Sequence, residues 1–420
     1  MQLPKVALVE YYFDPQRIED IPAEVGKEMQ RLRLQEKIRQ GDSVAISAGS
    51  RGIANIHIIT RAVVNELKKL GARPFIFPSM GSHGGATAEG QLTVLEKYGI
   101  SESSMGCPLR STMEVAYLGE GADGYPLYVD KYAAEADHIV LINRIKPHTK
   151  FSGPLESGLM KMMAIGMGKQ KGAEYYHRAA VRLTFEKIVE TVGSEILRKC
   201  PILFGLGIVE NGYDQTCVIR ALSPDDIAEG EKALLVVAKE RMARLPFDQI
   251  DVLVIDQIGK NISGTGMDVN VTGRNRDILG DYTTGPQVKR IFVRDLSEES
   301  EGNALGIGFA DFTTTRVTEK MDRKKTYINC LTAVSPEKGA IPIYFDTDRE
   351  ALEACFMTIG DIPVHRVRLV YIKSTLHLSR LSVSQAFEGE VSASDKLRRL
   401  DEWMEMALGK DGNIVSPFDS

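Results

Sequence analysis

Short apolar runs alternate with helical patterns through the first half of the chain, and this order constrains its fold most strongly. Residues 43–48 and 73–78 are compact, mostly apolar runs typical of buried strands. Residues 55–71 and 87–98 instead repeat their apolar side chains at helical spacing, although Gly90 falls in the first turn of the second helix. This order predicts an α/β fold, with a mostly parallel sheet flanked by helices.

A second domain is expected beyond Pro246, where a helical pattern ends. A chain of 420 residues exceeds the size of one ordinary hydrophobic core. We therefore expect an N-terminal α/β domain over residues 1–246 and a C-terminal α/β domain over residues 247–391. Residues 394–408 have a helical pattern, and the segment 392–420 is expected to pack back on the N-terminal domain.

The composition is that of a soluble globular protein, with 43% hydrophobic and 26% charged residues. A net charge of -5 argues against nucleic acid as a partner. The five cysteines include no C-x-x-C pair, so neither a zinc ribbon nor an iron–sulfur cluster is expected. The N-terminus resembles a strand rather than a secretion signal, and no long apolar run occurs, which predicts a cytoplasmic chain without membrane spans.

Two histidines follow strand patterns. His83 lies in the turn Gly81-Ser-His-Gly-Gly85, and His148 lies just beyond the apolar run at 138–145. Ligands of open α/β sheets bind at the carboxyl ends of the strands, so both histidines are candidate site residues. The alternatives are a turn histidine bonded to its own backbone and an ordinary histidine at a strand end.

Lys161 and His177 form a second pair of candidates. Lys161 is flanked by apolar residues in Leu159-Met-Lys-Met-Met163, and His177 follows one short segment later. Such a lysine either extends to solvent or is desolvated and reactive enough for covalent chemistry.

The stretch Ser47-Ala-Gly-Ser-Arg51 joins the first strand pattern to a helix. Backbone N–H groups at a helix N-terminus hold phosphate or carboxylate, which makes Ser50 and Arg51 candidate ligand contacts. The alternative for Arg51 is a solvated side chain.

Arg51, Gly81-Ser-His83, Pro147-His148, Ser157-Gly-Leu-Met-Lys161 and His177 together resemble the nickel-dependent lactate racemase family in residue type, order and approximate interval. The resemblance covers about residues 40–180. It implies two α/β domains with the active site in the cleft between them. It also implies a nickel pincer nucleotide as cofactor, in which a carbon and two sulfurs hold nickel and a histidine supplies the fourth ligand.

The resemblance assigns roles to these residues. Lys161 would be the attachment lysine of the cofactor and His177 its nickel ligand, while His83 and His148 would be the acid–base pair. The N-terminal domain would bind the cofactor and the C-terminal domain the substrate. The further cofactor contacts implied are Arg51, Ser50, Gly81 and Ser82.

The activity implied is racemisation or epimerisation of a 2-hydroxy acid by hydride transfer to and from the nickel pincer nucleotide. Two histidines suit this reaction, because each can move a proton near neutral pH on one face of the substrate. The expected partners are the small-molecule acid and the proteins that make or insert the cofactor. We expect no nucleic acid or membrane partner, and a monomer or homodimer.

The chain departs from the family mainly where substrate binds. The Tyr-Gln-x-x-Lys pattern of the lactate enzymes is missing, and its nearest counterpart is Thr272-Gly-Arg-Asn-Arg276. Ala48 also replaces an aspartate that the family usually carries. We therefore expect a 2-hydroxy acid other than lactate. Arg274 or Arg276 could pair with its carboxylate, and Lys260 could line the cleft, although this glycine-rich loop could also be purely structural.

Two other functions fit the same residues. One is a hydroxy-acid lyase or dehydratase, with Lys161 as base or Schiff-base former. The other is a non-catalytic protein that binds the nucleotide or an organic acid. Nickel content separates the first function from the family activity, and turnover excludes the second.

Overall fold

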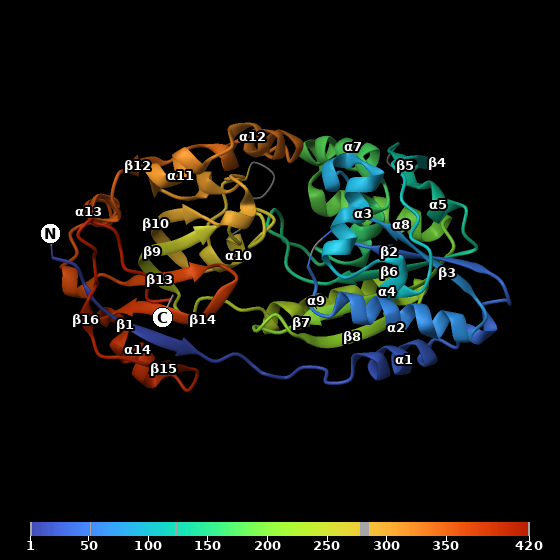
Figure 1. Cartoon of the computed structure of the whole chain (residues 1–420), viewed down its shortest axis with the longest axis horizontal. Helices are drawn as coiled ribbons and strands as arrows, with labels where there is room; N and C mark the ends of the chain where they lie inside the picture. Colours follow the sequence, from blue (N-terminus) through green and yellow to red (C-terminus); the bar gives the residue numbers. More distant parts are fainter. Residues whose placement is uncertain (1, 51, 122–123, 278–284, 419–420) are drawn as a thin grey trace. The chain divides into compact units, whose positions relative to one another are not determined.

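The computed structural model describes residues 2–50, 52–121, 124–277 and 285–418 of the chain. It divides the chain into two compact units, which are drawn in Figure 1. The internal unit is Asp14–Met242, and the terminal unit combines Met1–Phe13 with Ala243–Ser420. Both units are built from strands and helices, so the predicted α/β class is confirmed.

Among the described residues, the internal unit contains a five-stranded sheet in the order β3-β2-β6-β7-β8. The first four strands of this order are parallel, and β8 is antiparallel to β7. The strand patterns expected from the sequence are all present, because continuous apolar runs suit strands that are covered on both faces. The bounds are β2 Ser43–Ala48, β3 Arg73–Pro78, β6 His138–Arg144, β7 Ile202–Glu210 and β8 Thr216–Leu222.

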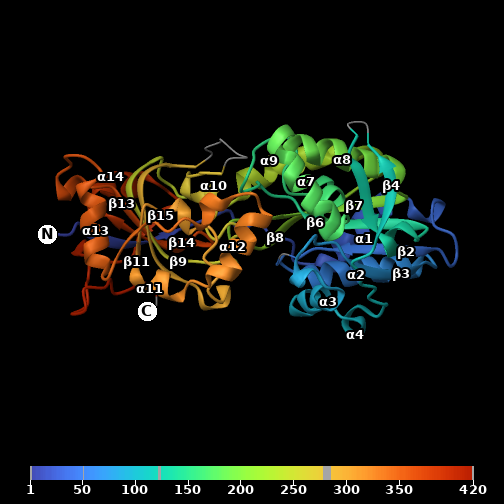
Figure 2. The same cartoon turned by 90° about the horizontal axis from the view of Figure 1, so that it is seen from above.

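Helices cover both faces of this sheet. Figure 2 shows α2 on one side of the unit and α8 and α9 on the other. The apolar side chains of α1 and α2 share one buried core with Val44 and Ile46 of β2. The bounds of the longer helices are α1 Ile21–Arg31, α2 Ile56–Lys69, α3 Ala88–Lys97, α7 Lys169–Leu183, α8 Phe185–Lys199 and α9 Ile227–Arg241.

Several short elements of this unit are not marked by the sequence pattern. β4 and β5 form a separate hairpin, and a short helix, α6, runs directly into a π-helical turn, Met162–Gly166. π-Helical turns inside helices occur frequently at functional sites. The bounds are α4 Glu102–Met105, β4 Val115–Glu120, β5 Pro126–Asp130, α5 Lys131–Ala134 and α6 Leu159–Lys161.

The described part of the terminal unit contains a nine-stranded sheet in the order β12-β11-β10-β9-β13-β14-β1-β15, with β16 also paired to β1. The strands from β12 to β13 are parallel, and β14, β1 and β15 continue the sheet in antiparallel pairs. The bounds are β1 Lys5–Tyr11, β9 Gln249–Ile258, β10 Gln287–Leu296, β11 Phe312–Thr314, β12 Ile343–Phe345, β13 Leu369–Ser374, β14 His377–Ser384, β15 Leu397–Arg399 and β16 Met404–Glu405. The helices are α10 Val269–Thr272, α11 Thr315–Lys320, α12 Arg323–Thr332, α13 Asp348–Met357 and α14 Glu388–Ala393.

The predicted helix at 394–408 is wrong, and so is the packing of 392–420 against the N-terminal domain. This segment instead supplies β15 and β16, which pair with β1 inside the terminal unit. Backbone bonds from Tyr12 N to Lys396 O (2.9 Å) and from Leu400 N to Leu8 O (2.8 Å) extend the pairing. The segment pairs with β1 despite its helical spacing, because this pairing gives the backbone N–H and C=O groups of both segments hydrogen-bond partners. Residues 1–13 likewise belong to the terminal unit, not to the N-terminal domain expected at 1–246.

No helix within the described ranges is both long and apolar enough to cross a membrane.

The glycine in the first turn of α3 has a packing reason. Thr87 caps this helix, with its hydroxyl accepting from Gly90 N at 3.0 Å. A β-carbon on Gly90 would lie 1.9 Å from the carbonyl oxygen of Gly84. The turn after His83 therefore lies directly on the helix backbone, and only glycine permits this approach.

We predict that Gly90→Ala destabilises the internal unit by about 1–3 kcal/mol, because the added methyl group overpacks this contact. Helix propensity alone predicts the opposite sign, a gain of about 1 kcal/mol. Urea unfolding followed by a probe in the internal unit measures the change. Gly26→Ala in α1 is the matched control in the same unit, because a β-carbon there would come no closer than 3.8 Å to its nearest neighbour, Glu66. A stability gain in Gly90→Ala would contradict the packing account.

Candidate active site

The loops after β2 and β3 meet at the carboxyl edge of the internal sheet. Ser50 follows β2, and its hydroxyl is hydrogen-bonded to Nδ1 of His83, which follows β3. The Tyr98 hydroxyl donates to Ser50 O at 3.1 Å and fixes the β2 loop from the side of α3. Two predicted site residues, Ser50 and His83, are therefore in direct contact. Arg51 lies outside the described residues.

The His83 turn is held by its backbone. Gly81 N donates to Gly166 O (3.4 Å), which joins the turn to the π-helical segment after Lys161. The side-chain amide of Gln91 donates to Gly81 O (2.9 Å) and to His83 O (3.4 Å). Gly81 has a positive φ of 58°, a conformation that glycine adopts without strain. Ser82 is half-buried between these anchors.

Lys161 ends α6 at the start of the π-helical segment. Its ammonium donates to Ser157 Oγ at 3.4 Å. Asn143, near the end of β6, donates to Gly158 O at 2.8 Å and holds this turn at the sheet edge. The lysine is therefore positioned beside the strands that deliver Ser50 and His148.

His148 is nearly buried, and its contacts define its tautomer. Its Nδ1 accepts from Lys150 N at 3.0 Å, so a neutral ring carries its proton on Nε2. Its backbone N–H donates to Glu156 at 2.6 Å, and Glu156 is paired with Lys239 at 2.6 Å. Phe151 lies against the imidazole, with ring centroids 4.4 Å apart.

His177 has the opposite arrangement. Its Nδ1 lies 2.6 Å from Ala173 O, and since a carbonyl only accepts, Nδ1 must donate. The lone pair of a neutral ring is then on Nε2, which is the form in which histidine binds metals. A backbone carbonyl behind the ring is the usual support for a metal-binding histidine.

Phe185 connects the two histidines. Its ring is stacked with that of His148 at 6.1 Å and meets the ring of His177 edge-on at 4.9 Å. The side chain is 1% exposed, so it forms a fixed apolar wall between the imidazoles. Thr184 precedes it with φ 78° and ψ 150°, a strained conformation of the kind that clusters at functional sites.

The structure also brings the His83 turn to the helix of His177. A β-carbon built on Gly81 would lie 3.5 Å from the side chain of Ala173, the residue whose carbonyl holds His177. The predicted residues Ser50, Gly81, His83, Lys161, His148 and His177 are thus linked by a continuous set of contacts in the internal unit.

The predicted substrate residues lie in the terminal unit. Arg274 and Arg276 both pair with Asp311, and Arg274 also donates to Val288 O (2.8 Å) and Lys289 O (3.0 Å). Lys260 donates to Asn329 at 3.0 Å. A substrate carboxylate at either arginine would compete with Asp311, so these roles stay predictions.

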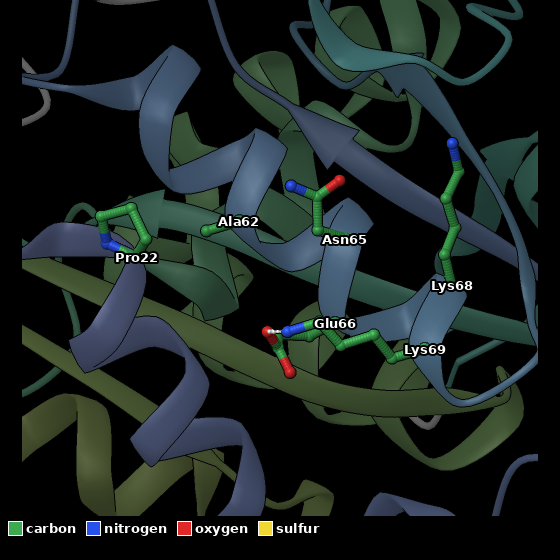
Figure 3. A pocket seen from close by; sticks show the side chains of 6 residues that line it. All are labelled: Pro22, Ala62, Asn65, Glu66, Lys68 and Lys69. Carbon is green, nitrogen blue, oxygen red and sulfur yellow. Dashed lines mark hydrogen bonds and ion pairs between the residues drawn. The ribbon is translucent and has the colours of Figure 1, made fainter.

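A surface hollow of about 540 Å³ lies between α1 and α2, lined by Pro22, Ala62, Asn65, Glu66, Lys68 and Lys69. Figure 3 shows the ion pair of Glu66 with Lys69 at its rim. Lys68 and Lys69 end α2, whereas the β2 loop with Ser50 precedes this helix. The hollow is therefore at the opposite edge of the sheet from the histidines.

In the portions of the chain that the structure describes, no three His, Cys, Asp or Glu side chains are grouped to hold a metal ion.

Sequence reasoning missed several residues that build the site. They come from distant parts of the chain and carry no local motif of their own. The only signals in the sequence were Gly158 and Gly90, since each glycine marks a position that another group approaches closely. The missed residues are Gln91, Asn143, Glu156, Lys169, Phe185 and Glu231.

Glu231 of α9 supports the Lys161 turn from beneath. It is 1% exposed, and its Oε2 accepts from Met160 N at 2.8 Å. In the described structure its Oε1 has no hydrogen-bond partner, and a β-carbon on Gly158 would lie 2.1 Å from that oxygen. Burial raises the pKa of Glu231 from 4.5 to about 7.

This raised pKa predicts a pH-dependent stability. The unfolded carboxyl loses its proton near pH 4.5 and the folded one near pH 7, so unfolding becomes easier as pH rises through this window. We expect Glu231 to lower the free energy of unfolding by on the order of 3 kcal/mol between these limits. Urea unfolding of the wild type and Glu231→Gln at both ends of the window tests this. Identical pH slopes in the two proteins would contradict it.

Comparisons with known proteins agree with this architecture. Residues 8–187 match the family model of the lactate racemase N-terminal domain. A crystal structure of a Thermotoga maritima protein is similar with a TM-score of 0.54 and 13% identity, over 87% of this chain and 99% of that chain. The lactate racemase apoprotein from Thermoanaerobacterium thermosaccharolyticum is similar with a TM-score of 0.49 and 14% identity, over 84% of this chain and 91% of that one. No curated protein sequence matches the chain.

At these identities, the first structural similarity supports the fold alone. The similarity to the lactate racemase family comes from the domain model, whose match spans Ser50, His83, His148, Lys161 and His177. Over residues 8–187 the chain is therefore similar to the lactate racemase N-terminal domain.

Proposed function

We propose that the chain is an isomerase that racemises or epimerises a 2-hydroxy acid with a nickel pincer nucleotide as cofactor. The match of residues 8–187 to the lactate racemase N-terminal domain supports a racemase- or epimerase-type enzyme in general. The observation that carries the finer proposal is the arrangement of His177, whose Nδ1 donates to Ala173 O and whose Nε2 bears the lone pair.

The residues present fit the cofactor. His177 offers one nitrogen of the type that nickel accepts, in the tautomer that a metal requires. Lys161 lies at a π-helical turn that Asn143 and Glu231 support from two sides. The turn of Gly81 and Ser82, with Ser50, would contact the nucleotide. When bound, this cofactor would accept a hydride from the substrate carbon and return it.

The two remaining histidines move the protons. In the direction in which His83 acts as base, it takes the proton of the substrate hydroxyl, and Ser50 at Nδ1 orients its ring. His148 acts on the other face of the substrate and so handles the opposite enantiomer, since racemisation requires an acid–base group on each face of the substrate. Phe185 and Phe151 keep water away from His148 and fix its plane.

The substrate is proposed to be a 2-hydroxy acid other than lactate, because the substrate pattern of the lactate enzymes is missing from the chain. The carboxylate roles of Lys260, Arg274 and Arg276 remain predictions, as do the cytoplasmic location and the cofactor-making partners. For a carboxylate at Arg276 to bind, the bond to Asp311 (2.8 Å) would have to be shared or broken.

The test is to produce the chain together with the enzymes that make the cofactor. We expect about one nickel per chain and, by intact mass, an adduct that is lost in Lys161→Ala if attachment is covalent. Polarimetry with single enantiomers of lactate, malate and aldonic acids then identifies the substrate. A loaded protein that eliminates water or cleaves carbon bonds would support a lyase or dehydratase instead. Loaded protein without turnover of any acid in this panel would support a binding protein.

A further inference from the structure

A buried ion pair lies beneath the His83 turn and has no part in the roles assigned above. Lys169, at the start of α7, and Asp130, at the end of β5, are 2.9 Å apart and both 0% exposed. Burial lowers the pKa of Lys169 and raises that of Asp130. A buried ion pair is weak grounds for stability, because desolvation offsets its attraction. Lys169 also has a positive φ of 53°, which is uncommon for a residue with a side chain.

The other contacts of Lys169 point to the site. Its ammonium also donates to Pro78 O, at the end of β3, and to Gln91 Oε1 at 3.0 Å. An ammonium group can only donate, so the amide oxygen of Gln91 must face Lys169. The NH₂ group of Gln91 must then face the turn, where it donates to Gly81 O and His83 O.

We propose that Lys169 and Gln91 are positioning residues for His83. The Lys169 ammonium sets the direction of the Gln91 amide, and the amide holds both carbonyls of the turn that carries the imidazole. Because Lys169 begins the helix of His177 and reaches the last residue of β3, the same cation fixes His83 relative to that helix. The catalytic part of this inference rests on the proposed function, whereas the geometric part does not.

Two variants separate positioning from folding. Gln91→Glu keeps the shape of the side chain and an acceptor for Lys169, but places a carboxylate oxygen against the carbonyls of Gly81 and His83. Lys169→Met/Asp130→Asn removes both charges together, so no uncompensated charge stays buried, and Gln91 is no longer oriented. Gln170→Glu is the matched control, because half-buried Gln170 bonds only Glu174 at 2.7 Å in the contacts described.

The first readout is the ¹³C–¹H signal of the His83 ring in the cofactor-free protein, assigned with His83→Gln. We expect this signal to shift in both test variants and to stay unchanged in Gln170→Glu, with thermal unfolding confirming a folded protein. If Gln91→Glu does not fold, the signal of Lys169→Met/Asp130→Asn tests the positioning role on its own. An unshifted His83 signal in a folded test variant would overturn the positioning role.

The second readout is turnover of the best acid of the panel by loaded enzyme. We expect kcat to fall by roughly 10²-fold with little change in KM, since small misplacements of a catalytic group have effects of this size. A shifted His83 signal with undiminished kcat would leave the geometric inference intact and refute the catalytic role of His83.

Discussion

His177→Ala should abolish activity and strip the loaded protein of most of its nickel, while the fold is retained. Removing a residue that merely supports a metal ligand lowers metal affinity by about 10–100-fold, so removing the ligand itself should exceed this range. The fold should survive because His177 is only partly buried, and its contacts include the Ala173 carbonyl and the edge of the Phe185 ring.

Nickel per chain by elemental analysis and circular dichroism of the same samples measure both effects. His57→Ala is the matched control, because His57 is an exposed histidine on α2. Normal nickel content in His177→Ala would remove this residue from the metal site.

His83→Ala and His148→Ala should each slow interconversion in both directions by on the order of 10²–10⁴-fold. Each histidine is the acid in one direction and the base in the other, so neither loss can be confined to one enantiomer. Nickel content should stay close to that of the wild type, which separates this pair from His177.

Initial rates from each pure enantiomer test this prediction, with exposed His365→Ala as control. A variant that racemises at the wild-type rate would reduce that histidine to a structural role. A variant that loses only one direction cannot result from racemisation at equilibrium, and would show that a different reaction is being followed.

The parallel core of the internal unit could be predicted from the sequence because its strands are buried on both faces. Their side chains therefore form continuous apolar runs, as in residues 43–48. The β4–β5 hairpin was missed because β4 is half-exposed and neither strand has such a run. The segment 394–408 was misassigned because helical spacing is a local property, whereas its pairing with β1 joins the two ends of the chain.

The sequence predicted site residues only where a chemically reactive side chain directly follows the end of a predicted strand. His83 and His148 follow β3 and β6, and the contact of His83 with Ser50 follows from the adjacency of β2 and β3. The supports of these residues were not predictable, because Gln91, Lys169 and Glu231 act through contacts that need the folded chain. In the sequence they are marked only by glycines at positions that another group approaches closely, as at Gly158.

The most direct test of the central claim is an anomalous difference map at the nickel edge from crystals of the loaded protein. The account predicts a nickel peak bonded to Nε2 of His177, with the cofactor extending toward Lys161 and the turn of His83. A nickel peak on another residue, or on Nδ1 of His177 with the Ala173 bond broken, would contradict it.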